Sequence, residues 1–397
     1  MPPKSKKRVK RAIPNADSER ETEPVTTTAL DSRTHPNDLP INLERKGFLA
    51  LPNELISQIL SYFPEIKMEH ILMNPTSVGS IKNAPNFFVR FEALRALSQL
   101  CRSSRQIFLP LLWERFQVCL TTNTGGQWYR NLGKAMQRRS KGMLKSQHLW
   151  PYVRVVTVSL TRFQTTTVLP PFVSMLRALP NVHTLEIPHA HSAMTTALKE
   201  AFEGSIFPSI QIVVMPTCAH EILRCCPSVR EVTCNEGDGG RLVGALAQGG
   251  CKKLEILRGV APGANLMKRF IKESPPLRCV GIDARSTDVE KLIQNYSSFP
   301  SLRVLEIDCG GGVKSVDHLV KIAQDTLRAC MEYRPATSAK KSRKNAGDDV
   351  VQTTSELVDL YSDPRVVRVL HFPPRHSYYL EQLSSEFVPS RIDEFPV

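Results

Sequence analysis

A proline-led apolar frame that recurs along the second half of the chain is the strongest constraint on its fold. With φ for an apolar residue and x for any residue, the frame Pro-x-φ-x-x-φ-x-φ occurs six times, and a seventh copy has lost its proline. Each φ-x-φ predicts a short strand with one buried face, because alternate side chains of a strand point to opposite sides. A proline just before such a strand is tolerated, since that position donates no ladder hydrogen bond.

The copies recur at roughly regular intervals, with a segment of helical character after each strand. They start at residues 153, 182, 210, 229, 254, 277 and 302, and a late copy reads Val367, Leu370 and Phe372. Apolar residues at helical spacing predict return helices over 172–179, 194–202, 242–247, 266–271 and 289–296, with a longer one from 316 to 333. Intervals of 19 to 29 residues resemble those of leucine-rich repeats, which stack into a solenoid. A doubly wound α/β sheet is the alternative, but six prolines in one frame favour the solenoid.

Upstream of the repeats, three short amphipathic helices are predicted. Residues 51–64 place apolar side chains at helical spacing until a proline ends the pattern. The same spacing runs through 91–101, Ser103 or Ser104 offers an N-cap, and a further turn ends at Trp113. So small a unit has little core of its own and would be stabilised by a partner that covers its apolar face.

The order of elements in this helical region resembles an F-box. The strings LPNELISQILSYF and LRALSQLCRSSRQIFLPLLWERF carry an opening Leu-Pro, a Glu-Leu-Ile-x-x-Ile-Leu, a Leu-Ser-x-Leu-Cys-Arg centre and a closing Leu-Trp. Together with the repeats, the chain is similar to fungal-type F-box proteins that have a C-terminal leucine-rich-repeat domain. The resemblance implies an α then α/β fold: a short three-helix F-box-like module followed by a leucine-rich-repeat solenoid. A polar insertion at about 64–90 departs from the family pattern.

The resemblance also implies a function without catalysis. In the family, the helical module docks on the Skp-type adaptor of a cullin ubiquitin ligase, and the repeats capture the protein to be ubiquitinated. Carried onto this sequence, the adaptor-binding residues are Leu51, Pro52, Leu55, Ile56, Ile59, Leu60, Leu97, Leu100, Cys101 and Trp113. The alternative is that these side chains form a private helical core. A different function class is also open: a nuclear scaffold or nucleic-acid-associated protein whose helices serve a non-ligase complex.

The net charge of +14 is concentrated in three segments. Residues 1–11, 130–145 and 338–344 hold six, six and four basic side chains without an acid, so the rest of the chain sums to −2. Two of these runs have no apolar periodicity, which is typical of solvated tails, so no folded basic face and no nucleic-acid partner are expected. The first run resembles a nuclear localisation signal, and the alternative is a solubilising tail. The expected location is therefore the nucleus, the cytoplasm or both. Its cations are Lys4, Lys6, Lys7, Arg8, Lys10 and Arg11.

The repeat frame also predicts a substrate-facing surface. Residues that alternate with the buried positions share the opposite side of the sheet. Those with polar chemistry are Glu186, Glu231, Asn235, Arg258, Asp283, Glu306 and Asp308. Five acids against one base predict an acidic face and a basic protein substrate, whose association such a face would accelerate. The alternative is that these are scattered solvated charges.

Chemistry that would indicate an enzyme is not apparent in the sequence. His189 and His191 lack a third metal ligand in range, and the ten cysteines contain no CxxC pair, so no metal and no cofactor are expected. The glycine clusters at 239–240 and 310–312 lack the context of a phosphate-binding loop and are interpreted as turns. A membrane span needs about 20 uninterrupted apolar residues, so no membrane partner is expected, and the start of the chain lacks the apolar segment of a signal peptide.

These patterns divide the chain into six parts. A basic, polar tail without order is expected over 1–47, the helical module over 48–118, and a basic helical linker over 119–150. The solenoid follows over 151–333, then a basic loop without order over 334–356, and a terminal repeat or cap with a tail over 357–397.

Overall fold

A single sheet organises most of the structured chain. The computed structural model describes residues 51–63, 84–119, 127–249, 251–286, 288–309, 316–332, 365–371 and 391–397. Among these residues, ten strands form one sheet whose spatial order follows their order in the sequence. The strands are β1 (Arg115–Val118), β2 (Val155–Val158), β3 (Thr184–Glu186), β4 (Ile212–Met215), β5 (Glu231–Cys234), β6 (Ile256–Arg258), β7 (Cys279–Asp283), β8 (Val304–Cys309), β9 (Val366–His371) and β10 (Arg391–Pro396).

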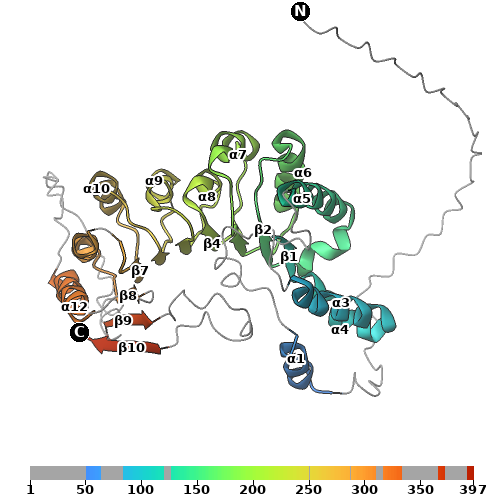
Figure 1. Cartoon of the computed structure of the whole chain (residues 1–397), viewed down its shortest axis with the longest axis horizontal. Coiled ribbons are helices and arrows are strands. Elements are labelled where there is room, and N and C mark those ends of the chain that lie inside the picture. Colours follow the sequence, from blue (N-terminus) through green and yellow to red (C-terminus); the bar gives the residue numbers. More distant parts are fainter. Residues whose placement is uncertain are drawn as a thin grey trace, which may run out of the picture. The chain divides into compact units, whose positions relative to one another are not determined.

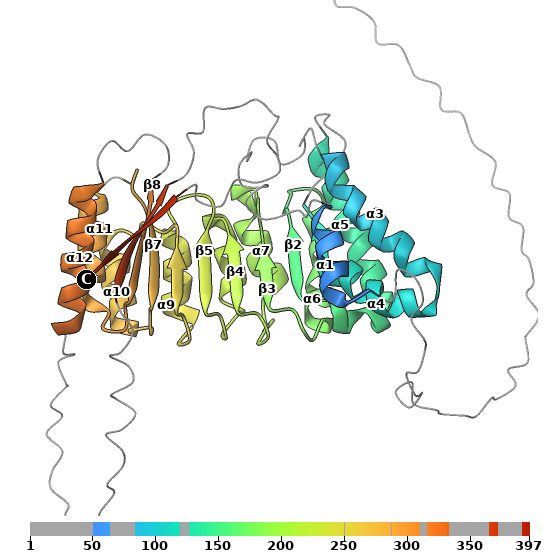
Figure 2. The same cartoon turned by 90° about the horizontal axis from the view of Figure 1, so that it is seen from below.

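The strand order differs from that of a doubly wound sheet. β1 to β9 pair in parallel, each with the next strand in sequence, and β10 closes the sheet antiparallel to β9. A doubly wound sheet reverses its strand order at a switch point and carries helices on both faces. Here the order never reverses, and Figure 1 shows the helices α6 to α10 on one side of the strands. The other side of the strands, seen in Figure 2, has no helical layer over β2 to β8.

The register of the sheet aligns the predicted repeat frame residue by residue. The middle apolar position of all seven copies forms one continuous row, flanked by Phe116 of β1 and Val367 of β9. That row is Val156, Leu185, Val213, Val232, Leu257, Val280 and Leu305. All seven side chains are completely buried. The predicted frame is therefore confirmed at the level of strand position and facing direction.

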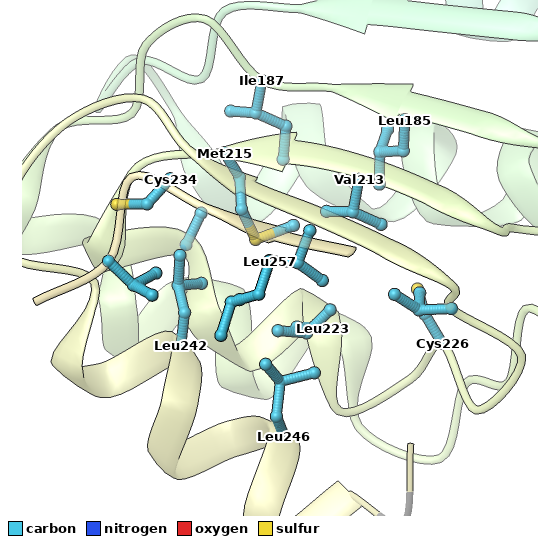
Figure 3. Packing of buried hydrophobic residues seen from close by; sticks show 14 of the residues in the cluster. Leu185, Ile187, Val213, Met215, Leu223, Cys226, Cys234, Leu242, Leu246 and Leu257 are labelled. Atoms are coloured by element: carbon cyan, nitrogen blue, oxygen red, sulfur yellow. The ribbon is translucent and has the colours of Figure 1, made fainter. Parts of the chain in front are cut away.

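A layer of helices covers the buried side of this row. The helices are α5 (Trp128–Lys145), α6 (Thr165–Ala178), α7 (Thr195–Phe202), α8 (His220–Leu223), α9 (Gly240–Gly249), α10 (Ala264–Glu273), α11 (Val289–Asn295) and α12 (Asp317–Glu332). They include every return helix that apolar spacing predicts, and the short α8 in addition. Figure 3 shows Leu223 of α8 and Leu242 and Leu246 of α9 in one buried cluster with Leu257 of β6 and Met215 of β4.

The two ends of the sheet differ from the sequence expectations. β1 carries no copy of the repeat frame, yet it adds a strand before β2. α5 packs into the main core through Leu132, Met136 and Met143. The segment 119–150 is therefore not a plain linker. At the other end, Val367 pairs with Leu305 and not with Leu302. The predicted late copy is correct as a strand but wrong in frame by three residues, because apolar residues at 366, 367, 369 and 370 fit more than one register. Phe372, its last position, lies outside the described residues.

The N-terminal helical module consists of α1 (Asn53–Ser61), α3 (Ala84–Leu100) and α4 (Arg102–Trp113). Its core is built by Ile56 and Leu60 of α1 with Leu94, Phe108 and Leu112. α3 begins earlier than predicted, inside the polar insertion. The cap of α4 is Cys101 and not a serine: its sulfur accepts a hydrogen bond from the backbone N–H of Ser104 at 3.4 Å. The basic tail with Lys4–Arg11, the rest of the insertion and the basic loop at 334–356 lie outside the described residues.

The module and the sheet are joined without a flexible connection. α4 leads directly into β1, and the half-buried side chains of Leu109 and Trp113 contact both the module core and the sheet core. The backbone carbonyl of Glu114, between the two elements, accepts hydrogen bonds from Arg154 and Val155 at 2.9 and 3.1 Å. The end of α4 is thus held in place by the first strands of the sheet.

A buried phenol gives a stability prediction for the helical layer. Tyr296 is completely buried, and its hydroxyl has no hydrogen-bond partner among the described residues; this burial raises its pKa. Tyr296→Phe should leave the free energy of unfolding unchanged or raise it, because no hydrogen bond is removed. As a matched control, Thr157→Val should lower that free energy by about 1–3 kcal/mol, since the Thr157 hydroxyl donates to Glu186 at 2.6 Å. Urea unfolding of both variants measures the difference, and a destabilised Tyr296→Phe would contradict the interpretation.

Candidate functional site

Helix α1 carries two apolar rows, of which the module core uses one. Ile56 and Leu60, four residues apart, are 2% and 4% exposed. Leu55 and Ile59, also four residues apart, are 43% and 38% exposed, and Tyr62, one turn further, is 80% exposed. Residues three and four apart on a helix are surface neighbours, so Leu55, Ile59 and Tyr62 form a continuous strip, here called the α1 ridge.

A second exposed apolar position lies at the junction of α3 and α4. Leu100, the last residue of α3, is 71% exposed, and Cys101 beside it is also exposed. Leu97, one turn earlier, is half-buried and packs against the module core. Apolar side chains of this size, gathered on a small helical unit, are typical of a surface that another protein covers.

The ten predicted adaptor-binding residues thus divide by burial into three groups. The exposed ones are Pro52, Leu55, Ile59, Leu100 and Cys101, the half-buried ones are Leu51, Leu97 and Trp113, and the buried ones are Ile56 and Leu60. Pro52 precedes α1, and its carbonyl accepts the first helical hydrogen bond, from Ile56. Tyr62 is also exposed, although it is not among the ten predicted residues; its position one turn after Ile59 is the signal that identifies it.

The second candidate surface is the side of the sheet that no helix covers, here called the open face. Strand alternation places Glu186, Glu231, Arg258, Glu306 and Arg368 on it, opposite to the buried row. Asp283, at the end of β7, and Asp308, near the end of β8, lie directly opposite each other in the sheet. Asn235 differs from these residues because its amide donates to the backbone carbonyl of Ile187 at 2.9 Å, which gives it a role within the fold.

The charges of the open face are largely paired with one another. The Nε of Arg258 donates to Glu306 at 2.6 Å, while its Nη1 reaches Glu231 at 2.5 Å. Arg368 donates to Glu394 of β10 at 2.8 Å and lies 3.9 Å from Glu306. This chain of interactions links β5, β6, β8, β9 and β10 across the face.

Arg258 can reach over a neighbouring strand because that strand offers no side chain there. Gly281 of β7 lies between Arg258 and Glu306 in the register. A Cβ at Gly281 would lie 2.8 Å from the Cγ of Arg258, too close for the side chain to stay in place. Burial acts to lower the pKa of Arg258, but the hydrogen bond and charge of Glu306 outweigh it and raise that pKa. Arg258 is therefore a permanent cation held by two carboxylates.

The excess of acids on this face is smaller than the predicted five to one. The count of five acids against one base omits Arg115 of β1 and Arg368 of β9, which lie on the same side of the sheet as the acids. Arg115 lies 3.6 Å from Glu186, and Asp283 accepts from Arg285 at 2.8 and 2.6 Å. With Arg115 and Arg368 the strands place five acids against three bases on the open face, and most of these charges are paired. Partly exposed apolar side chains of Ile212, Val214, Ile256, Val304 and Val366 lie among them.

The described part of the chain contains cysteine and histidine side chains that could in principle take part in catalysis. No cluster of three or more metal-ligating side chains occurs among the described residues. Burial raises the pKa of Cys119 and Cys279 to about 12, so these thiols stay protonated at neutral pH. Burial also lowers the pKa of His189, which packs edge-on against Trp128 with ring centres 5.9 Å apart.

Comparison with protein-family models and with curated proteins found no match to this chain. Within the residues that the structure describes, no helix combines the length and the apolar character needed to cross a membrane. The α1 ridge and the open face are therefore the features from which function is inferred.

The paired charges predict that Glu306 stabilises the fold, whereas the more exposed Glu394 contributes little. Glu306→Gln should lower the free energy of unfolding by about 1–3 kcal/mol, because the side chain of Glu306 is 9% exposed and holds Arg258. Glu394→Gln, the same change at a 54% exposed partner of Arg368, should cost less than about 1 kcal/mol. Chemical denaturation of both variants measures this, and equal effects would contradict a structural role for Glu306.

Proposed function

We propose that this chain is the substrate-recognition subunit of a Skp-cullin-F-box ubiquitin ligase. The α1 ridge and Leu100 dock the Skp-type adaptor, and the open face of the sheet captures the protein substrate. The chain itself supplies binding and no catalytic group. The carrying observation is the double apolar character of α1, since a helix needs one apolar row to pack on its own module and α1 has two.

The exposed row has the size that an interface anchor requires. Full burial of an exposed leucine or isoleucine side chain is worth about 1.5–3 kcal/mol before the costs of association. Leu55 and Ile59, which are 43% and 38% exposed, can each contribute a part of this. With Tyr62 the α1 ridge offers three exposed side chains, and Leu100 is a fourth. The resemblance of residues 51–63 and 94–116 to an F-box indicates which partner covers them.

The sheet supports the second half of the proposal. Sequential parallel strands, a repeated φ-x-x-φ-x-φ frame and helices on one side are features that leucine-rich-repeat solenoids share, and we infer that this is the architecture. Solenoids of this kind bind proteins on the extended strand face. Here that face offers half-exposed apolar residues between paired charges, a mixture suited to a folded protein surface.

The joint between α4 and β1 gives the proposal a mechanical basis. A ligase subunit must hold its substrate at a fixed distance from the adaptor, and a flexible linker would not do so. Trp113 and Leu109 contact both cores, so the docking helices and the first strands behave as one packed unit. Trp113 therefore supports the interface from behind, which fits its half-buried position.

A charge placed on the α1 ridge tests adaptor docking. Ile59→Lys in the full-length chain should lower affinity for the Skp-type adaptor at least about tenfold, because an anchor residue would be replaced by a desolvated cation. The melting temperature should stay close to that of the parent protein, since the Ile59 side chain is partly solvent-exposed. Calorimetric titration with purified adaptor measures the affinity.

Two matched variants keep this test specific. Ser57→Lys adds the same charge to α1 on an exposed position about 160° around the helix from Ile59 and should leave adaptor binding unchanged. Ile56→Ala removes a buried side chain and should lower stability by about 2–5 kcal/mol. If Ile59→Lys binds the adaptor as well as Ser57→Lys does, the proposal fails. Co-purification that depends on nuclease-sensitive nucleic acid would instead favour the scaffold alternative.

A further inference from the structure

The second basic run of the sequence lies in a folded helix. Helix α5 contains six cations and no acidic residue. Arg139 faces away from the other five and donates to the backbone carbonyl of Gln117. The other five are Arg130, Lys134, Arg138, Lys141 and Lys145. All five side chains are exposed. The expectation that no folded basic face exists does not hold for this helix, because the apolar pattern between the cations is strong enough to anchor it.

The five cations share one narrow side of α5. Their spacings are four, four, three and four residues. At about 100° per residue they fall within an arc of about 80°, and at about 1.5 Å per residue they extend over about 22 Å. We call this row the α5 stripe. Leu132, Gly133, Met136, Ser140 and Met143, which are buried, occupy the opposite side of the helix.

The buried side holds the stripe in a fixed orientation. Leu132, Met136 and Met143 belong to the main core of the sheet. A Cβ at Gly133 would lie 2.7 Å from the ring of Phe163, so α5 packs closely on the segment that follows β2. The stripe cannot turn inward, and its cations are presented to solvent as a straight row.

The charges of the stripe are not neutralised within the described chain. No described carboxylate forms an ion pair with any of the five, and Arg130 donates to the amide oxygen of Gln127 at 3.3 Å. Like charges three and four residues apart on a helix repel each other and oppose helix formation. A polyanion laid along the stripe would remove that repulsion and would release its own counterions.

We infer that the α5 stripe binds the phosphate backbone of a nucleic acid, independently of base sequence. A DNA duplex carries about one negative charge per 1.7 Å of its axis, so a row of about 22 Å meets several phosphates together. Protein interfaces instead depend on buried apolar anchors, whereas the stripe is flanked by Asn131, Gln137 and Gly142. This binding is separate from docking through the α1 ridge.

Neutralising the stripe in the full-length chain tests the inference. Binding of a fluorescein-labelled DNA duplex of about 20 base pairs is measured by anisotropy between about 50 and 200 mM salt. The triple variant Lys134→Ala, Arg138→Ala, Lys141→Ala should bind at least about tenfold more weakly at the lowest salt. The slope of log affinity against log salt should fall by about three, because each of the three cations neutralises about one phosphate.

A second helix provides the charge-matched control. Lys268, Arg269 and Lys272 of α10 are also exposed, and their replacement by alanine removes the same net charge. This control should bind within about twofold of the parent protein. Both variants keep the basic run at 4–11, so the difference between them reports on α5 alone.

Three results would overturn the inference. The parent protein could fail to bind the duplex at about 50 mM salt, or both triple variants could lose affinity equally, which would mean that only total charge matters. Poly-L-glutamate at equal charge concentration could also displace the duplex completely, which would assign the stripe to an acidic protein. If poly-L-glutamate displaces the labelled duplex at least about tenfold less effectively than unlabelled duplex does at equal charge concentration, the result supports binding to the phosphate backbone.

Discussion

Alignment of the buried row is the constraint on which the rest of this structure depends. The strands are three to six residues long, too short to build a core individually. Parallel pairing in strict sequence order places the middle apolar residue of each copy beside that of the next, from Val156 to Leu305. One continuous core results, and each helix of the covering layer needs only to pack on its own and the neighbouring repeat.

This arrangement leaves one side of a parallel sheet without a helical cover. Parallel sheets in other folds are usually buried on both faces. Here the second side is satisfied by its own side chains: Arg258 lies over Gly281 to reach Glu306, and Glu186 accepts from Thr157. The ion pairs that stabilise the open face also make it a preorganised surface for a partner, since its charged side chains are already ordered.

β10 forms the border of the sheet and is exposed to solvent. β10 runs antiparallel to β9 and brings Arg391, Asp393 and Glu394 to the border of the sheet. Charged side chains on a border strand oppose pairing with another chain. Asp393 accepts from both Arg391 and His371, and these hydrogen bonds, that of Arg391 foremost, lower its pKa.

Burial decides which residues of an apolar or basic pattern serve the core and which form a surface. α1 is amphipathic in sequence, yet only the fold shows that Ile56 and Leu60 serve the core while Leu55 and Ile59 remain exposed. α5 is similar, because its cations are a charge run in sequence, and five of the six form a single straight row in the structure. In both helices the core residues decide the orientation, and the remaining face becomes a surface with its own chemistry.

The sequence by itself determined the strands β2 to β8, their buried positions and most of the helices, because these depend on local periodicity and on prolines at a constant offset. It could not determine β1 or β10, which carry no copy of the repeat frame, or the frame of β9, whose apolar residues fit more than one register. Nor could it show that Arg258 pairs with Glu306, 48 residues away, since that interaction needs the register and the empty position at Gly281. Tertiary structure decided which apolar and charged side chains stay exposed, because burial depends on what packs against each helix.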